Sequence, residues 1–107
     1  MDALPIATLQ ERAGAATAFL KNFTHRDRLM LACALVGGEM SVGALEEQLG
    51  IRQPGLSQQL AALREAGLVA TRREGKAVFY RLADARVEVF MGTLHRLFCA
   101  MEEKDHG

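Results

Sequence analysis

The sequence contains little cysteine and no long hydrophobic run. Its two cysteines, Cys33 and Cys99, lie far apart in the chain, which excludes a disulfide scaffold and the ligand spacing of a zinc finger. The longest apolar run, residues 29–36, is far shorter than the ~20 residues that a membrane-spanning helix needs. The first residues also lack the apolar core of a signal peptide. We therefore expect a cytoplasmic protein in a reducing environment.

The chain has no excess of either charge, because 13 basic residues balance 13 acidic ones. A balanced total does not exclude nucleic-acid binding, since binding depends on where the charges lie. The sequence has no paired carboxylates, nucleophile elbow or phosphate-binding loop, so we expect neither an enzyme nor a cofactor. Its 107 residues, half of them hydrophobic, predict one domain that would gain stability from a partner.

What the sequence does contain is a series of amphipathic segments. Apolar residues at helical spacing predict helices at about residues 7–22, 25–36, 41–49, 54–66 and 84–102. The second of these is apolar nearly all round, so we expect it at the centre of the fold. Pro54 is expected at the first position of the fourth helix. The expected N-caps of the other four are Thr8, Thr24, Ser41 and Asp84.

A different pattern follows the fourth predicted helix. The stretch LVATRREGKAVFYRL has two runs of β-branched and aromatic residues on either side of Glu74-Gly75, which predicts a β-hairpin. Two helices joined by a tight turn and followed by a hairpin form a winged helix-turn-helix. The predicted fold class is therefore mainly α with a small β-hairpin, in a single domain spanning residues 1–107.

The fourth helix and the hairpin have the chemistry of a DNA-binding surface. With the leucines of the fourth helix turned inward, Gln58 points outward, Ser57 and Gln59 flank this outer face, and Gln53 lies at the helix start. Glutamine amides and serine hydroxyls can read base edges or hold phosphates. From Arg52 to Arg81, six basic residues accompany only two acidic ones, so the neutral chain contains a basic region. Two alternatives stay open: ordinary solvated side chains, or an interaction module that binds a protein and not DNA.

The segment QPGLSQQLAALREAGLVATRREGKAVFYRL resembles the ArsR/SmtB family of bacterial winged-helix repressors. The matching motifs are Q-P-x-x-S-x-x-L, L-x-x-A-G-L-V and R-x-G-K-x-x-x-Y, and the likeness extends over nearly the whole chain. It implies a homodimer on an imperfect palindrome of double-stranded promoter DNA, which the dimer leaves when an inducer arrives. It also implies a set of DNA-contacting residues, with the last two in the wing on phosphates or the minor groove: Gln53, Ser57, Gln58, Gln59, Arg73 and Lys76.

One position departs from this resemblance. Arg52 stands where such proteins often have Ser or another residue that caps the following helix. The expected cap of the fourth helix is therefore missing, and Arg52 is a candidate for an added phosphate contact.

The last predicted helix has more apolar surface than one small core can cover. Its near-heptad stripe predicts pairing, together with the first helix, across a two-fold axis that spaces two reading helices about one DNA turn apart. The alternative is that the stripe packs only on its own domain. The expected interface residues are Phe19, Phe90, Leu94, Leu97, Phe98 and Met101.

Metal ligands are missing from the positions that metal-sensing members of the family use. The third predicted helix, SVGALEEQLG, has no cysteine. The last helix has Asp84, but Arg86, Leu97 and Ala100 stand where its other ligands would fall. A zinc site needs three or four convergent ligands, and the three histidines are scattered. We therefore expect no metal.

The two cysteines resemble those of the sulfide-responsive branch of the family, the BigR, SqrR and HlyU type, which has one cysteine on each of these two helices. The resemblance implies that reactive sulfur species (persulfide or polysulfide) join Cys33 and Cys99 through a disulfide or polysulfide bridge that weakens operator binding. His95 or Arg96 would favour the Cys99 thiolate. The residues alone leave other possibilities: peroxide, haem or a metal on Cys99 and His95 as the signal, or thiols that only fill space.

Overall fold

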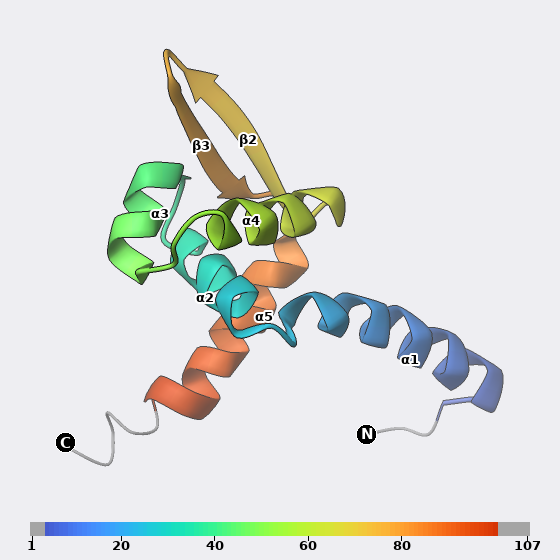
Figure 1. The fold of residues 1–107 in the computed structure, drawn as a ribbon. Helices are drawn as coiled ribbons and strands as arrows, with labels where there is room; N and C mark the ends of the chain where they lie inside the picture. Colours follow the sequence, from blue (N-terminus) through green and yellow to red (C-terminus); the bar gives the residue numbers. More distant parts are fainter. Residues whose placement is uncertain (1–3, 101–107) are drawn as a thin grey trace.

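The structure, a computed structural model, describes residues 4–100 and has the predicted order of elements (Figure 1). Its helices are α1 (Ile6–Leu20), α2 (Arg26–Leu35), α3 (Val42–Leu49), α4 (Gly55–Glu65) and α5 (Ala85–His95). A 3₁₀ turn, η1 (Lys21–Phe23), leads from α1 toward α2, and a π-helical turn, η2 (Arg96–Ala100), continues α5. Within residues 4–100 no helix is long and apolar enough to span a bilayer.

The predicted hairpin is confirmed and belongs to a small antiparallel sheet. Strands β2 (Val69–Glu74) and β3 (Ala77–Leu82) pair in the register Val69↔Leu82 to Glu74↔Ala77. The turn between them uses Gly75 at φ 61°, a left-handed conformation that suits glycine. A two-residue strand, β1 (Met40–Ser41), pairs with β3 on its other side and was not predicted. The hairpin rises from the helical body above α4 (Figure 1).

Two of the four predicted N-caps are confirmed. The Ser41 hydroxyl accepts from the Ala44 N–H at 3.1 Å, and the Asp84 carboxylate accepts from the Arg86 N–H at 2.9 Å. The prediction for Thr24 is wrong, because its hydroxyl donates to the Lys21 carbonyl and the ring of the next residue, His25, caps α2.

The predicted N-cap of the first helix is also wrong, because α1 begins at Ile6, directly after Pro5, and Thr8 lies inside it. Pro5 takes the cap position with φ −55° and ψ 144°, and its side chain makes no capping hydrogen bond. Pro54 precedes α4 by one residue and takes the cap position, where we had expected the first helical residue.

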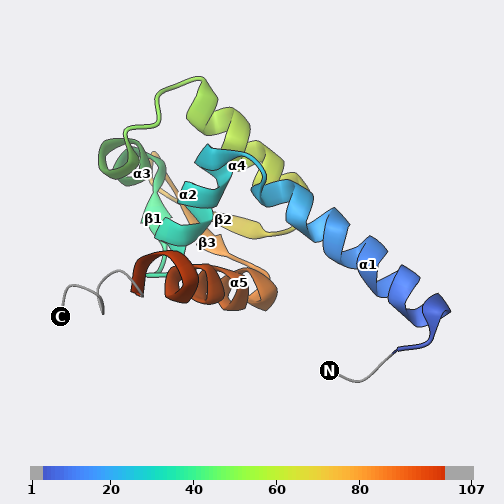
Figure 2. The same cartoon turned by 90° about the horizontal axis from the view of Figure 1, so that it is seen from below.

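The core lies between α2, α3, α4, α5 and the base of the sheet. Its fully buried side chains are Leu31, Leu45, Leu56, Leu60, Leu63 and Val87, and truncating one such leucine to alanine costs about 2–5 kcal/mol. α2 lies between α4 and α5, as its apolar sequence predicted (Figure 2). α1 is the exception, because none of its 15 residues is buried and it projects from the body (Figure 2).

Candidate nucleic-acid interface and thiol pair

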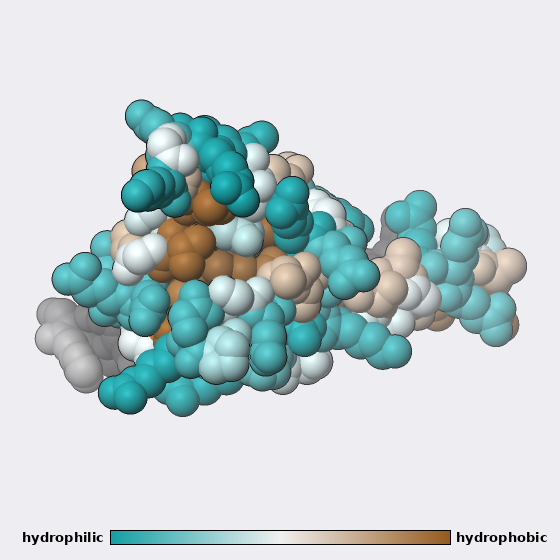
Figure 3. All heavy atoms as spheres, turned by 45° about the horizontal axis from the view of Figure 1, so that its top comes forward, coloured by the Kyte–Doolittle hydropathy of each residue, from teal (hydrophilic) through white to brown (hydrophobic). Residues whose placement is uncertain are grey.

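The outer face of α4 has the polarity that a groove-reading helix needs. Leu56, Leu60 and Leu63 hold the helix on the core, and this turns Ser57 and Gln58 to the solvent, where both side chains are exposed. Viewed from the side of the hairpin, the molecule shows mainly hydrophilic atoms around a hydrophobic hollow (Figure 3). Ser57 and Gln58 are therefore accessible to a partner, as the sequence predicts.

The first turn of α4 is capped by the chain itself. The Oε1 atom of Gln53 accepts from the Ser57 N–H at 3.0 Å, which supplies the cap that Arg52 does not provide. The Leu56 and Gln58 N–H groups donate to the carbonyls of Arg52 and Pro54 at 3.0 and 3.1 Å. Gln53 thus has a structural contact in addition to its predicted role at the DNA, and the amides of this turn are already satisfied.

Gln59 is half-buried, and two residues at the start of α2 engage its amide. The Arg28 Nε–H donates to Gln59 Oε1 at 2.7 Å, and the Gln59 Nε2 atom lies 3.3 Å from His25 Nε2. A bidentate contact with adenine would need both ends of this amide. The DNA-reading role of Gln59 stays a prediction, but its observed contacts hold α4 against α2.

The two arginines of β2 differ in that Arg72 is paired and Arg73 is not. Arg72 Nε donates to both carboxylate oxygens of Glu39 at 2.9 and 2.8 Å, its Nη1 donates to Glu74 at 2.9 Å, and its guanidinium lies 4.5 Å above the Phe79 ring. These hydrogen bonds raise the pKa of Arg72, and the bond from Arg72 lowers the pKa of Glu39. Adjacent strand residues face opposite sides, so Arg73 points away from this cluster.

Arg73 and Lys76 are exposed, Arg73 on β2 and Lys76 at the hairpin turn. Both are free to meet a phosphate as predicted. The sequence count of the basic region overstates its free charge, because Glu39, which lies outside the counted segment, neutralises Arg72 together with Glu74.

The two cysteines line one hollow, although neither is buried. Both side chains are exposed, including that of Cys33, although it lies on the helix that the sequence places at the centre of the fold. Cys33 from α2 and Cys99 from η2 border an open hollow of about 240 Å³. Its other walls are Leu29, Met91, Leu94, His95 and Phe98. The fold therefore brings the two predicted redox residues to one apolar site beside an imidazole.

Comparison with known proteins agrees with this architecture. The model of a family described as "Bacterial regulatory protein, arsR family" matches residues 25–71, from the cap of α2 to β2. A relative called "Biofilm growth-associated repressor", from Agrobacterium fabrum, is 52% identical over 94% of this chain and 86% of its own length. The chain belongs to the arsR family of bacterial regulatory proteins.

Two further comparisons place this arsR-family chain beside the BigR and HlyU proteins. "Transcriptional activator HlyU" from Vibrio cholerae is 41% identical over 85% of this chain and 84% of its own length. The crystal structure of the transcriptional repressor BigR from Xylella fastidiosa superposes with a TM-score of 0.84 at 48% identity, covering 90% of this chain and 98% of that one. The winged helix-turn-helix fold and the predicted likeness to the BigR and HlyU proteins are confirmed, and the protein is a DNA-binding transcriptional regulator of this type.

On the last helix, two of the positions where metal-sensing members of the arsR family have ligands hold Asp84 and Arg86, which pair with each other here. Asp84 accepts from Arg86 at 2.7–3.1 Å, which lowers the pKa of the carboxyl group, and the Arg86 guanidinium lies 4.8 Å above the Phe19 ring. Across residues 4–100, no three His, Cys, Asp or Glu side chains gather where they could hold a metal ion.

The predicted dimer residues of this arsR-family chain fall into two groups. Phe19 and Phe90 form an aromatic cluster with Phe23, with ring centroids 5.3–5.6 Å apart, and Leu94 packs beside the same core. Leu97 and Phe98 are 56% and 68% exposed. Further exposed apolar residues on α1 and α5, which the prediction did not include, are Ile6, Leu9, Leu20 and Val89. Met101 lies outside the described residues.

Proposed function

We propose that this protein is a homodimeric repressor that binds promoter DNA and releases it when a reactive sulfur species links Cys33 to Cys99. The observation that carries the proposal is the apolar hollow that both cysteines line, 240 Å³ in volume. The names of its relatives include a repressor and an activator; repression fits the printed name of the more similar one. We propose no enzymatic activity and no bound cofactor, and we place the protein in the cytoplasm with its promoter.

The exposed apolar surface supports a dimer with a second copy of the chain. A helix of 15 residues with no buried side chain is marginally stable by itself, so α1 needs a surface to cover it. Leu9 on α1 and Val89 on α5 are 54% and 70% exposed. Pairing these helices around a two-fold axis would bury both and would place two copies of α4 on one face of DNA.

The sulfur chemistry balances within the dithiol and its oxidant. The thiolate of one cysteine attacks an S–S bond of a polysulfide, forms a cysteine persulfide and displaces a shorter polysulfide or hydrosulfide. The thiolate of the other cysteine then attacks the inner sulfur of that persulfide and displaces hydrosulfide, which leaves a disulfide. The two thiols lose two electrons and two protons, and the polysulfide takes up both. When the first step leaves a longer chain, Cys–S–S–SH, attack of the second thiolate on the sulfur next to the terminal one displaces hydrosulfide and leaves one extra sulfur in the bridge.

α2 gives this chemistry a route to the DNA-reading helix. Cys33 lies toward its C-terminal end, while His25 and Arg28 at its other end contact Gln59 on α4. A bridge to Cys99 would fix α2 against the end of α5, which also carries dimer surface. A movement of α2 would change the position of α4, and a movement of α5 would change the spacing of the two copies of α4.

The proposal is tested by DNA binding before and after sulfur treatment. Fluorescence anisotropy with labelled promoter duplex would compare reduced, polysulfide-treated and peroxide-treated protein, alongside Cys33→Ser and Cys99→Ser. We expect polysulfide to weaken binding of the wild type and to leave both variants bound, with affinity restored by a thiol reductant. Unchanged wild-type affinity after complete modification would overturn the sensor.

Mass spectrometry identifies the bridge in the same samples. A disulfide loses two hydrogen atoms, whereas each retained sulfur atom adds its own mass. If peroxide lowers the affinity for DNA as much as polysulfide does, the signal is a general oxidant and not a reactive sulfur species.

A further inference from the structure

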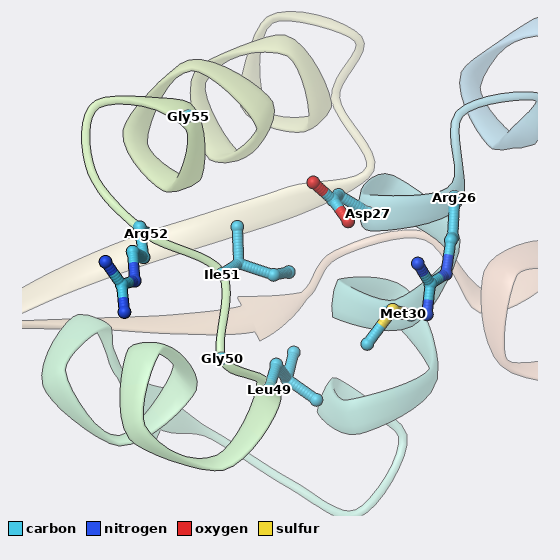
Figure 4. Close-up of a pocket in the computed structure, with 8 residues that line it drawn as sticks. All are labelled: Arg26, Asp27, Met30, Leu49, Gly50, Ile51, Arg52 and Gly55. Carbon is cyan, nitrogen blue, oxygen red and sulfur yellow. The ribbon is translucent and has the colours of Figure 1, made fainter.

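A second hollow lies between the start of α2 and the turn that leads into α4. It has a volume of about 320 Å³ and is open to solvent (Figure 4). Arg26, Asp27 and Met30 from α2 form one side, and residues 49–52 with Gly55 form the other. Because Gly55 is the first residue of α4, this hollow adjoins the proposed DNA-reading helix and is separate from the hollow between the cysteines.

Two arginines from different elements stand on opposite sides of this hollow. Arg26 and Arg52 are both exposed, and Figure 4 shows their side chains on its two sides, with Asp27 between them and above. Within residues 4–100 neither arginine forms an ion pair, in contrast to Arg72 and Arg86. The charged groups around the hollow therefore sum to one net positive charge, which suits a singly charged phosphodiester.

Most backbone N–H groups in the first turn of α4 are already hydrogen-bonded and cannot bind an anion. The Leu56, Ser57 and Gln58 N–H groups, which begin α4, all donate within the chain. A phosphate at this end of α4 must therefore be held by side chains. Arginine is well suited, because its planar guanidinium can make two parallel hydrogen bonds to phosphate oxygens.

We propose that Arg26 and Arg52 contact backbone phosphates of one DNA strand that crosses this hollow beside α4. The proposal extends the DNA surface from α4 and the wing to the start of α2, and it rests on the DNA binding proposed above. Contacts of this kind position the protein on the duplex and carry no base information. They act equally on any sequence and make the affinity more dependent on salt.

The test measures salt dependence with the full-length protein. Two labelled duplexes would serve, one selected by the wild type from a random-sequence pool and one scrambled from it. The slope of log affinity against log salt would be measured for Arg26→Gln, Arg52→Gln and the double variant. A dimer brings two copies of each arginine to the duplex, and each phosphate contact releases its own counterions. Each single change should therefore make the slope of dimer binding shallower by about 1.8 on both duplexes, and the double variant by about 3.6.

Controls separate charge from folding. Lys21→Gln, on the exposed 3₁₀ turn η1, removes the same charge away from the hollow and should leave the slope unchanged. Arg26→Lys should keep a wild-type slope, and thermal melting would identify any variant that is not folded.

Three results would overturn the inference. Unchanged slopes in the double variant, while the wild type binds its selected duplex, would refute the phosphate contacts alone. A loss confined to the selected duplex would assign these arginines to base reading. A wild type that binds neither duplex would refute the proposed function itself.

Discussion

Arg72 shows how one side chain can set the direction of the wing. It joins Glu39, which precedes β1, to Glu74 and Phe79 in the hairpin. Because Arg72 lowers the pKa of Glu39 below its ordinary value of 4.5, the ionised carboxylate stabilises the fold above that pH. This stabilisation is lost as the pH falls through the lowered pKa, where the carboxylate takes up a proton.

We therefore expect Glu39→Gln to lower the melting temperature at pH 7, and the difference from wild type to shrink as the pH falls below 4.5 and through the lowered pKa of Glu39. Both proteins would be melted by circular dichroism across this range, with Glu46→Gln, which removes an exposed carboxylate on α3, as the matched control. A difference that stays constant as the pH falls from 7 to well below 4.5 would mean that the pair does not act through the ionised carboxylate. The effect is expected to be small, because the pair is on the surface.

Gln53 and Gln58 carry the same side chain but have different roles in the structure. Gln53 caps the Ser57 N–H, so Gln53→Ala should destabilise the fold by about 1 kcal/mol, as the loss of an N-cap does. Gln58 is exposed on α4, so Gln58→Ala should leave stability unchanged and weaken binding to the selected duplex. Urea unfolding and anisotropy would measure the two quantities, and equal stability losses in both variants would refute the cap.

The residues that sequence alone placed correctly are those whose partners are close along the chain. Ser41 and Asp84 cap helices through N–H groups two or three residues away, and such patterns can be read directly. The contacts of Arg28 with Gln59 and of Arg72 with Glu39 span 31 and 33 residues. No local signal specifies them, because the packing of α2 on α4 and of the wing on the β1 segment creates them.

At the scale of elements, α1 is the segment whose neighbour is missing from a single subunit. If α1 and α5 form the dimer, a charge at Leu9 or Val89 would be buried without a partner, which costs several kcal/mol. We expect Leu9→Glu and Val89→Glu to weaken the dimer by more than about tenfold. Sedimentation velocity over a concentration series would measure this.

The matched control is Val36→Glu, at the exposed end of α2 and outside both helices. This variant should stay dimeric. DNA affinity should fall by about 100-fold or more in a true monomer, because one half-site no longer assists the other. If Leu9→Glu and Val89→Glu both sediment like the wild type, the proposed interface is wrong.

The helices and the hairpin follow from periodicity and turn residues, but two elements do not. β1 has two residues, too few for an alternating pattern, and exists because it pairs with Tyr80 and Phe79 on β3. The π-helical turn at the end of α5 was expected as ordinary helix, since the apolar spacing continues through it. Sequence could not show that this turn carries Cys99 to the hollow beside α2.

At the scale of the whole molecule, the thiols and the DNA surface are connected by thermodynamics as well as by structure. If bridging Cys33 and Cys99 weakens DNA binding, bound DNA must resist bridging by the same factor, because coupling between two sites is reciprocal. DNA stabilises the reduced form, so the midpoint potential of the dithiol should rise. For each tenfold loss of affinity per dithiol, the rise should be about 30 mV.

The protein would be equilibrated in thiol–disulfide buffers with and without saturating selected duplex, and the remaining free thiols would be counted by alkylation and mass spectrometry. The control is the scrambled duplex at the same concentration as the selected duplex, and it should leave the midpoint potential of the dithiol unchanged. Equal midpoint potentials with and without the selected duplex would show that the disulfide does not change the affinity for DNA. Release by polysulfide would then require sulfur atoms retained in the bridge, because a longer bridge holds α2 and η2 in a different geometry from a direct S–S bond.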